Sequence, residues 1–221
     1  MGILSRYFST NDLSDIKNAV KEAESKTSGE IVPFFAEASH HYKEWIWLGS
    51  FIGGALGGFI LLGMDIGEYR SWDYSSLESI TFVWSGAFLG LVLSFFISKL
   101  RLFLVPYRSK AFFVNLKAKE AFLDEEIFRT GNRTGILIYI SLYEKIVRIL
   151  PDTGIANIVP KSDWDAAVNL IVQGMKSGKK KEGIVASILF CGELLVKYGI
   201  KIQKDDKNEI SDEIRDGGTQ L

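Results

Sequence analysis

Two stretches of the chain, residues 45–64 (WIWLGSFIGGALGGFILLGM) and 79–98 (SITFVWSGAFLGLVLSFFIS), contain no Asp, Glu, Lys, Arg or His. Each has 20 residues, about the length that an α-helix needs to cross the hydrocarbon core of a bilayer. A helix in a soluble domain usually keeps one polar stripe, and these stretches carry only scattered Ser and Thr. The sequence therefore predicts two membrane-spanning helices.

The 14 residues between the stretches, 65–78, are too few for a domain, so we expect a helical hairpin that enters the bilayer and returns. This linker is acidic, with one Arg against four carboxylates, whereas the outer flanks are basic: Lys43, Lys99, Arg101, Arg108 and Lys110. Because Lys and Arg collect on the cytoplasmic side, we expect a two-pass protein of the plasma (inner) membrane with both termini in the cytoplasm.

Glycines recur at spacings of four within both stretches: Gly49, Gly53 and Gly57, then Gly54 and Gly58, then Gly86 and Gly90. Small residues at this spacing let two helices approach closely in lipid. The partner of these faces is either the other stretch or a second copy of the chain, and the second alternative makes a homo-oligomer.

The overall composition excludes several classes of protein. The net charge is −1, so no global basic field attracts nucleic acid, and we predict no nucleic-acid partner. The single cysteine, Cys191, cannot form an internal disulfide, and its apolar surroundings favour a small core residue. The chain lacks the HExxH, CxxC, Walker and GxSxG patterns.

The segment before the hairpin predicts one helix and one strand. Apolar residues recur at helical spacing over 11–26, and Thr10 or Asn11 can cap the start of this helix. The apolar stretch 30–38 (EIVPFFAEA) follows as a strand. Pro33 cannot donate a hydrogen bond to a neighbouring strand, so we expect this strand at an edge of the sheet or bulged there.

The segment after the hairpin predicts further helices and strands. Residues 136–142 form a continuous apolar strand, typical of one covered on both faces, and 145–150 alternate as its antiparallel neighbour. Helices are expected over 109–128, 161–176 and 182–198, the first with its large apolar side chains on one side. Residues 201–221 form a polar C-terminal tail that we expect to be loosely ordered.

The helix and strand over 11–36 cannot form a core alone and need the elements of 109–200. Since both ends of a hairpin return to the same side of the membrane, residues 1–43 and 106–200 can meet. The sequence thus predicts one cytoplasmic α/β domain, interrupted by a transmembrane hairpin over 44–105.

Two stretches carry a resemblance to a known family. Residues 8–32 (FSTNDLSDIKNAVKEAESKTSGEIV) hold a helix followed by Thr-Ser-Gly-Glu and a strand, and residues 133–171 begin with Arg-Thr-Gly, a hydrophobic strand and a Ser-Leu-x-Glu turn. With residues 182–195 as the closing helix, the chain resembles the TPM domain family in its bacterial membrane-hairpin form. The resemblance implies a central sheet of about four strands flanked by helices.

The same resemblance implies two kinds of function. Some thylakoid members of the wider family are described as acid phosphatases with acidic side chains and a bound divalent cation, and others are accessory proteins in a membrane. The Asp-Asn-Gly that often precedes the central strand in the wider family is replaced here by Asn132, Arg133, Thr134 and Gly135. This sequence therefore lacks the acid of that motif.

Three residues at the predicted strand ends are candidates for a site. Glu30 opens the first strand, Arg133 precedes the central strand and Asp152 follows the last one. If the strands are adjacent, these residues share a rim, where Glu30 and Asp152 are candidate ligands for calcium or magnesium. In the alternative, Glu30 or Asp152 pairs with Arg133 or caps a helix. Glu144 is interpreted as an ordinary turn charge.

Two functions remain open at this stage. The first is a non-catalytic accessory or interaction module at the membrane, without a cofactor, whose partners are the lipid bilayer and a membrane or cytoplasmic protein. The second is a phosphatase that uses a divalent metal ion to hydrolyse phosphomonoesters. We expect the first, because no set of residues meets the geometric demands of catalysis from sequence alone.

Overall fold

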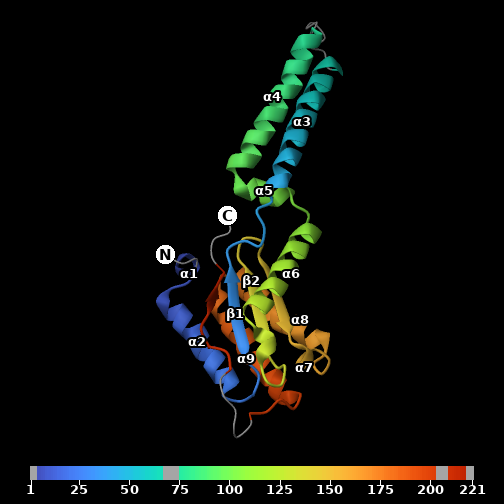
Figure 1. Ribbon diagram of the computed structural model, residues 1–221. Coiled ribbons are helices and arrows are strands. Elements are labelled where there is room, and N and C mark those ends of the chain that lie inside the picture. The colour runs from blue at the N-terminus through green and yellow to red at the C-terminus, as the bar shows by residue number, and fades with distance from the viewer. Residues whose placement is uncertain (1–3, 67–74, 203–208, 218–221) are drawn as a thin grey trace. The chain divides into compact units, whose positions relative to one another are not determined.

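The computed structural model describes residues 4–66, 75–202 and 209–217 (Figure 1). The chain divides into two compact units. One unit joins residues 1–40 to residues 111–221, and the other is formed by residues 41–110. The segments on either side of the hairpin thus fold into one body.

The larger unit is a mixed α/β fold with a four-stranded sheet of order β3-β2-β1-β4, which confirms the expected fold class (Figure 1). β1 and β2 are parallel, β2 and β3 are antiparallel, and β1 and β4 are parallel. The strands are β1 Ile31–Ala36, β2 Ile136–Ser141, β3 Ile146–Pro151 and β4 Arg215–Asp216. All six residues of β2 are buried, as expected for a strand covered on both faces.

Pro33 lies where, among the residues described, no strand pairs with the outer side of β1. The carbonyls of Glu30 and Ala36 accept hydrogen bonds from the β2 side, whereas the Phe35 carbonyl accepts one from Gly217 on the other side. Bonding direction alternates along a strand, so the missing N–H of Pro33 is on the outer side, before β4 pairs with Phe34 and Phe35. The expected edge position is therefore correct for the first half of β1.

The expectation of a loosely ordered tail is wrong for residues 209–217. β4 comes from this segment and adds the fourth strand to the sheet. The Nε atom of Arg215 donates a 2.6 Å hydrogen bond to the Glu125 carboxylate, and the Gly217 N–H donates to the Phe35 carbonyl at 2.8 Å. A few specific bonds to β1 and to the rest of the unit order a segment whose polar composition predicted disorder.

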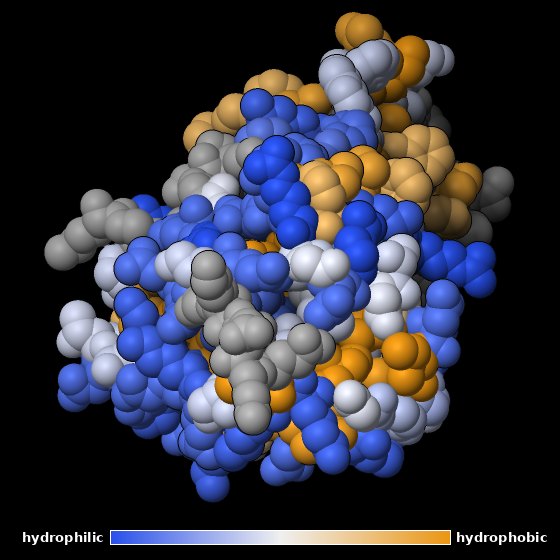
Figure 2. Space-filling model, turned by 60° about the horizontal axis from the view of Figure 1, so that its bottom comes forward, coloured by the Kyte–Doolittle hydropathy of each residue, from blue (hydrophilic) through white to orange (hydrophobic). Residues whose placement is uncertain are grey.

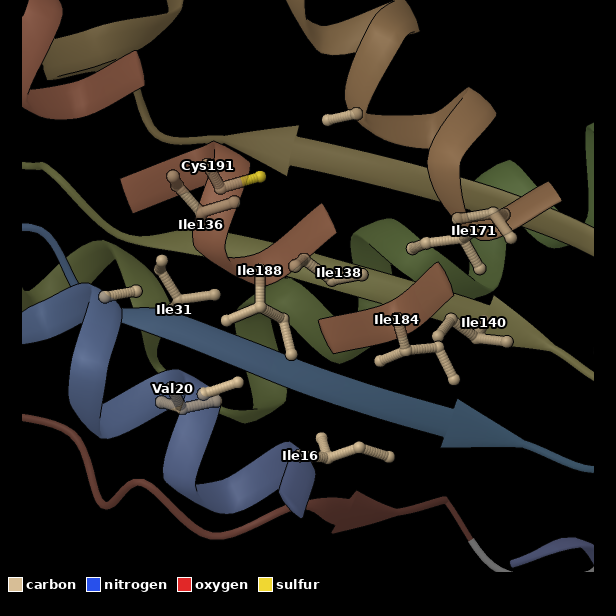
Figure 3. Close-up of a cluster of buried hydrophobic side chains, with 14 of the residues drawn as sticks. Ile16, Val20, Ile31, Ile136, Ile138, Ile140, Ile171, Ile184, Ile188 and Cys191 are labelled. Carbon is tan, nitrogen blue, oxygen red and sulfur yellow. The ribbon is translucent and has the colours of Figure 1, made fainter. Parts of the chain in front are cut away.

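Three helices cover one face of the sheet: α2 Thr10–Glu24, α8 Lys161–Lys176 and α9 Lys180–Lys197. Their isoleucines interlock with those of β1 and β2, and Cys191 lies fully buried among them (Figure 3). The helix α2 begins one residue earlier than expected, because Ser9 and Asp12 form a reciprocal capping box. At the crossing of α8 and α9, a Cβ on Gly174 would lie 2.7 Å from the Gly183 Cα, so two glycines allow this close approach.

The helix α6, Tyr107–Asp124, covers the other face. Its buried side consists of Val114, Ala118 and Ala121, which pack with Leu137 and Tyr139 of β2. The larger apolar residues of α6 lie mostly outward, with exposed fractions of 64% for Phe112, 53% for Leu116 and 60% for Leu123. The small residues of this helix therefore form the core contact, and the large ones form part of the surface.

Short elements complete this unit. They are the helices α1 Leu4–Tyr7 and α7 Thr153–Ala156 and the 3₁₀-helix η2 Ile127–Arg129. The face of the molecule in Figure 2 is mainly hydrophilic, with hydrophobic residues in separate patches.

The second unit contains the helical hairpin. Its elements are the 3₁₀-helix η1 Lys43–Trp45, α3 Ile46–Ile66, α4 Ser76–Phe96 and α5 Ser98–Leu104, which ends just before Pro106. The glycine faces of α3 and α4 pack against each other: a Cβ on Gly53 would lie 2.2 Å from the Gly86 carbonyl oxygen, and one on Gly90 would lie 2.2 Å from the Gly49 oxygen. These glycines form the contact between α3 and α4 of the same chain. A homo-oligomer remains a prediction.

Candidate functional site

The three candidate residues lie at one end of the sheet. Ile31 is aligned with Ile136 of β2, and Ile136 with Pro151 of β3. Glu30, Arg133 and Asp152 therefore share the rim that the sequence predicted. Two strand spacings, about 10 Å, separate the backbones of Glu30 and Asp152, with the loop that carries Arg133 between them.

Asp152 makes one hydrogen bond and one ion-pair contact, and both are structural. One oxygen, Oδ1, accepts from the Thr153 N–H at 2.6 Å and caps α7. The other, Oδ2, lies 2.8 Å from Arg133 Nε, with the Asp152 side chain 2% exposed and that of Arg133 47% exposed. This geometry matches the structural alternative for Asp152, which both pairs with Arg133 and caps a helix.

The backbone around Arg133 is held tightly against α7. Arg133 has φ +55°, a left-handed conformation that a non-glycine residue adopts at a cost. Its N–H donates to the Thr130 carbonyl at 2.9 Å, and its own carbonyl accepts from the Gly154 N–H at 3.0 Å. A Cβ on Gly154 would lie 2.4 Å from the Asn132 carbonyl oxygen, so only glycine lets α7 approach this loop so closely.

Glu30 is 7% exposed and contacts the C-terminal segment. Its Oε1 accepts a 3.0 Å hydrogen bond from the Glu209 N–H. The Glu209 carboxylate in turn accepts from the Gly131 N–H at 2.8 Å. The segment that supplies β4 is thereby fixed to the loop before β2, so Glu30 takes part in closing the fold at this rim.

A further carboxyl group at the same rim was not identified from the sequence. Glu24, the last residue of α2, accepts a 2.8 Å hydrogen bond from the outward N–H of Ile31. Burial raises the pKa of Glu24 to about 8, the Ile31 bond opposes this shift, and the nearby charges of Glu30 and Asp212 add to it. With this pKa, Glu24 is mostly protonated at pH 7. The helical spacing of 11–26 placed it at a helix end but did not show that it covers the edge of β1.

The opposite end of the sheet holds a buried hydroxyl network. The Glu144 carboxylate accepts from the Ser39 N–H at 2.9 Å and from the Ser141 hydroxyl. The Ser39 hydroxyl lies 3.1 Å from the Tyr139 hydroxyl, and burial raises the pKa of Tyr139 to about 12. Glu144 is 7% exposed, so its interpretation as an ordinary turn charge is wrong. The sequence signal that could have indicated this buried role is the Ser-x-x-Glu spacing of Ser141 and Glu144.

A small cavity lies beside this network on the α6 side of the sheet. Its volume is about 100 Å³, and Lys117, Glu120, Asp124 and Tyr139 provide its polar lining. The space is large enough to hold ordered water molecules beside these polar side chains. Among the residues described, no group of three or more His, Cys, Asp or Glu side chains is placed to hold a metal ion.

Comparison with known proteins adds a likeness of fold. No protein-family model matches the chain, and no curated protein matches it significantly. A solved structure, the NMR structure of the BA42 protein from the psychrophilic bacterium Bizionia argentinensis, superposes with a TM-score of 0.57 at 20% sequence identity. The match covers 95% of this chain and 94% of BA42. At this identity the likeness concerns the fold alone.

Proposed function

We propose that the protein is a membrane-anchored, TPM-like α/β module that binds another protein and catalyses no reaction. The observation that carries this proposal is the outward apolar surface of the hairpin. Both α3 and α4 are long and apolar enough to span a membrane, and only 11% and 6% of their apolar stretches are buried. A core helix of a soluble domain is mostly buried, so neither α3 nor α4 fits that class of helix.

The exposed side chains include many large hydrophobic ones. Phe51, Phe59, Trp84, Phe88 and Phe96 are each about 70% exposed or more. In water, apolar area of this kind costs about 25 cal/mol per Å², and a contiguous patch marks a membrane or protein contact. Two such helices side by side suit a bilayer. The acidic linker and the basic flanks in the sequence support an orientation in which the linker faces outward and both termini are cytoplasmic.

The non-catalytic part of the proposal is supported by how the candidate residues are bonded. Asp152 caps α7 and pairs with Arg133, and Glu30 binds the backbone of the C-terminal segment. A catalytic carboxylate needs an oxygen directed at substrate or at a metal ion. The bonds that Asp152 and Glu30 form with other described residues hold the rim together.

The binding part of the proposal is supported by the outward side of α6. Phe112, Leu116 and Leu123 lie at positions i, i+4 and i+11, which places them on one face of the helix. All three are more than half exposed. Large apolar side chains exposed on one helix face are typical of a surface that docks another protein.

Photo-crosslinking tests this surface. A photoreactive phenylalanine analogue is placed at Leu116 of the full chain in native membranes, and the same analogue at Gln173, an exposed position on α8, serves as the control. We expect one discrete heterologous adduct from position 116 and none from position 173. Equal labelling from both positions, or none from either, contradicts a docking surface on α6.

An enzymatic assay tests the alternative of a metal-assisted phosphatase. The purified protein is titrated with calcium, magnesium and manganese, and hydrolysis of a generic phosphomonoester is measured for the unchanged chain and for Asp152→Asn. We expect no metal-dependent turnover in either. Turnover that requires metal and disappears in Asp152→Asn would establish the phosphatase and overturn the non-catalytic proposal.

A further inference from the structure

An apolar groove of about 530 Å³ runs along the hairpin between α3 and α4. Its walls are formed by side chains such as Ile52, Leu56 and Leu89, and glycines of both helices contribute to its floor. Leu100 and Leu104 of α5 line it as well. The groove lies wholly within the hairpin unit.

The length of the groove corresponds to one leaflet of a bilayer. Its lining on α3 extends from Gly49 to Ile60, eleven steps of 1.5 Å, or about 17 Å. Half of the hydrocarbon core is about 15 Å thick. The groove therefore has the depth that one acyl chain occupies, in the leaflet nearest to α5.

One polar side chain, Ser94, lines the groove near α5, and a basic residue, Arg101, directly follows the lining residue Leu100. The Ser94 side chain lines it and is fully buried, and its hydroxyl has no hydrogen-bond partner among the residues described. The Nε atom of Arg101, on α5 between Leu100 and Leu104, is likewise buried without a partner in the described part of the chain. A hydroxyl and a guanidinium at this depth match the ester and the phosphate of a phospholipid.

A second copy of the hairpin suits this groove less well. The glycines that a second helix would use, Gly49, Gly53, Gly86 and Gly90, already contact the facing helix of the same chain. A helix from another copy would also extend over the whole hairpin, whereas the groove covers about one leaflet. The apolar length and the positive charge at one end fit a single anionic lipid.

We propose that the hairpin holds one anionic phospholipid, with an acyl chain in the groove and its phosphate on Arg101. This inference rests on the proposed membrane anchoring. The bound lipid fills the groove beside the α3–α4 contact and pairs a half-buried guanidinium. The hairpin would thereby prefer anionic regions of the membrane.

Native mass spectrometry of the full chain in mild detergent tests the proposal. The protein is mixed with equal amounts of phosphatidylglycerol and phosphatidylcholine that carry the same acyl chains. We expect one bound lipid per chain, with phosphatidylglycerol favoured by about fivefold, the contribution of one basic residue near an anionic surface. Arg101→Gln should reduce this ratio to about one. Lys99→Gln, an equal change of charge at an exposed position of the same helix, should leave it within about twofold.

A second pair of variants tests the acyl-chain part separately. Ser85 lines the groove, so Ser85→Phe should displace both lipids, whereas Ala55→Phe, on the exposed surface outside the groove, should retain them. Equal ratios in Arg101→Gln and Lys99→Gln, or a dimer in place of the lipid adduct, would overturn the proposal. Flotation of the same samples with vesicles separates this failure from a failure of membrane anchoring, because an anchored chain floats whether or not a lipid is bound specifically.

Discussion

Replacement of Glu24 by Gln should change how the stability of the α/β unit depends on pH. Burial raises the pKa of Glu24 from 4.5 to about 8. Between these values the unfolded chain loses a proton that the native chain keeps, so the free energy of unfolding falls as pH rises through this interval. Above a pH of about 8 this group causes no further change. The Gln side chain keeps an oxygen for the Ile31 N–H and carries no charge at any pH.

The size of the effect follows from the shift. A difference of about 3.5 pKa units corresponds to at most about 4.8 kcal/mol. Because the Glu24 side chain is only partly buried, solvent screening reduces this figure, and we expect about 2 kcal/mol. Glu24→Gln should therefore match the unchanged protein near pH 4.5 and exceed its free energy of unfolding by about 2 kcal/mol at pH 8.5.

Labelling of Cys191 measures this quantity in the full chain. This cysteine is buried in the core of the α/β unit, so a thiol reagent that reacts at acidic and neutral pH reports unfolding of that unit and not of the hairpin. The protected fraction is followed against urea at several pH values. Glu22→Gln removes an exposed carboxylate from the same helix and should have little effect. A difference between Glu24→Gln and the unchanged protein that stays constant from pH 4.5 to 8.5 would refute the reasoning.

Three further predictions follow. Ile138→Ala, at a fully buried position, should lower the free energy of unfolding by about 2–5 kcal/mol in the Cys191 assay, whereas Ile158→Ala at a half-exposed position should cost under about 1 kcal/mol; equal losses would contradict the assigned core. Gly53→Ala, whose Cβ would meet the Gly86 oxygen, should lower the melting temperature of the hairpin in detergent by several degrees, and Gly63→Ala, with open space around it, should not. Asp152→Asn keeps the α7 cap and removes the charge of a buried carboxylate that pairs with a half-exposed arginine, so urea unfolding should show a cost of about 1–3 kcal/mol.

Much of the fold could be predicted from local patterns. The helix over Lys161–Lys176 has the expected bounds, and the antiparallel pair of β2 and β3 follows from two apolar stretches joined by a short turn. Periodicity and length carry this information because each element buries its own apolar face. The charge-free stretches likewise predicted the bounds of both hairpin helices to within a few residues.

The parts that could not be predicted depend on contacts between distant segments. β4 is two residues of a polar segment, ordered by bonds to β1 and to Glu125, and no local pattern indicates such a strand. On α6 the sequence placed the large apolar side chains on one side of the helix, and most of that side lies outward. The close contact with the sheet selected Val114, Ala118 and Ala121.

The candidate site shows the same division. The sequence placed Glu30, Arg133 and Asp152 at one rim because each is next to a strand end, and the strand register brings those ends together. Sequence reasoning left open whether these residues act or support. The cap on α7, the ion pair and the bond to Glu209 are three-dimensional facts.

Membrane extraction is the most direct measurement of the central claim, which is that lipid surrounds α3 and α4. Membranes from a detergent-free lysate are washed with alkaline carbonate and then floated through a density gradient. We expect the full chain to float with the lipid, and a variant with residues 46–96 replaced by a Gly-Ser linker to remain in the wash. Recovery of the full chain in the wash or in the initial supernatant would contradict a membrane hairpin.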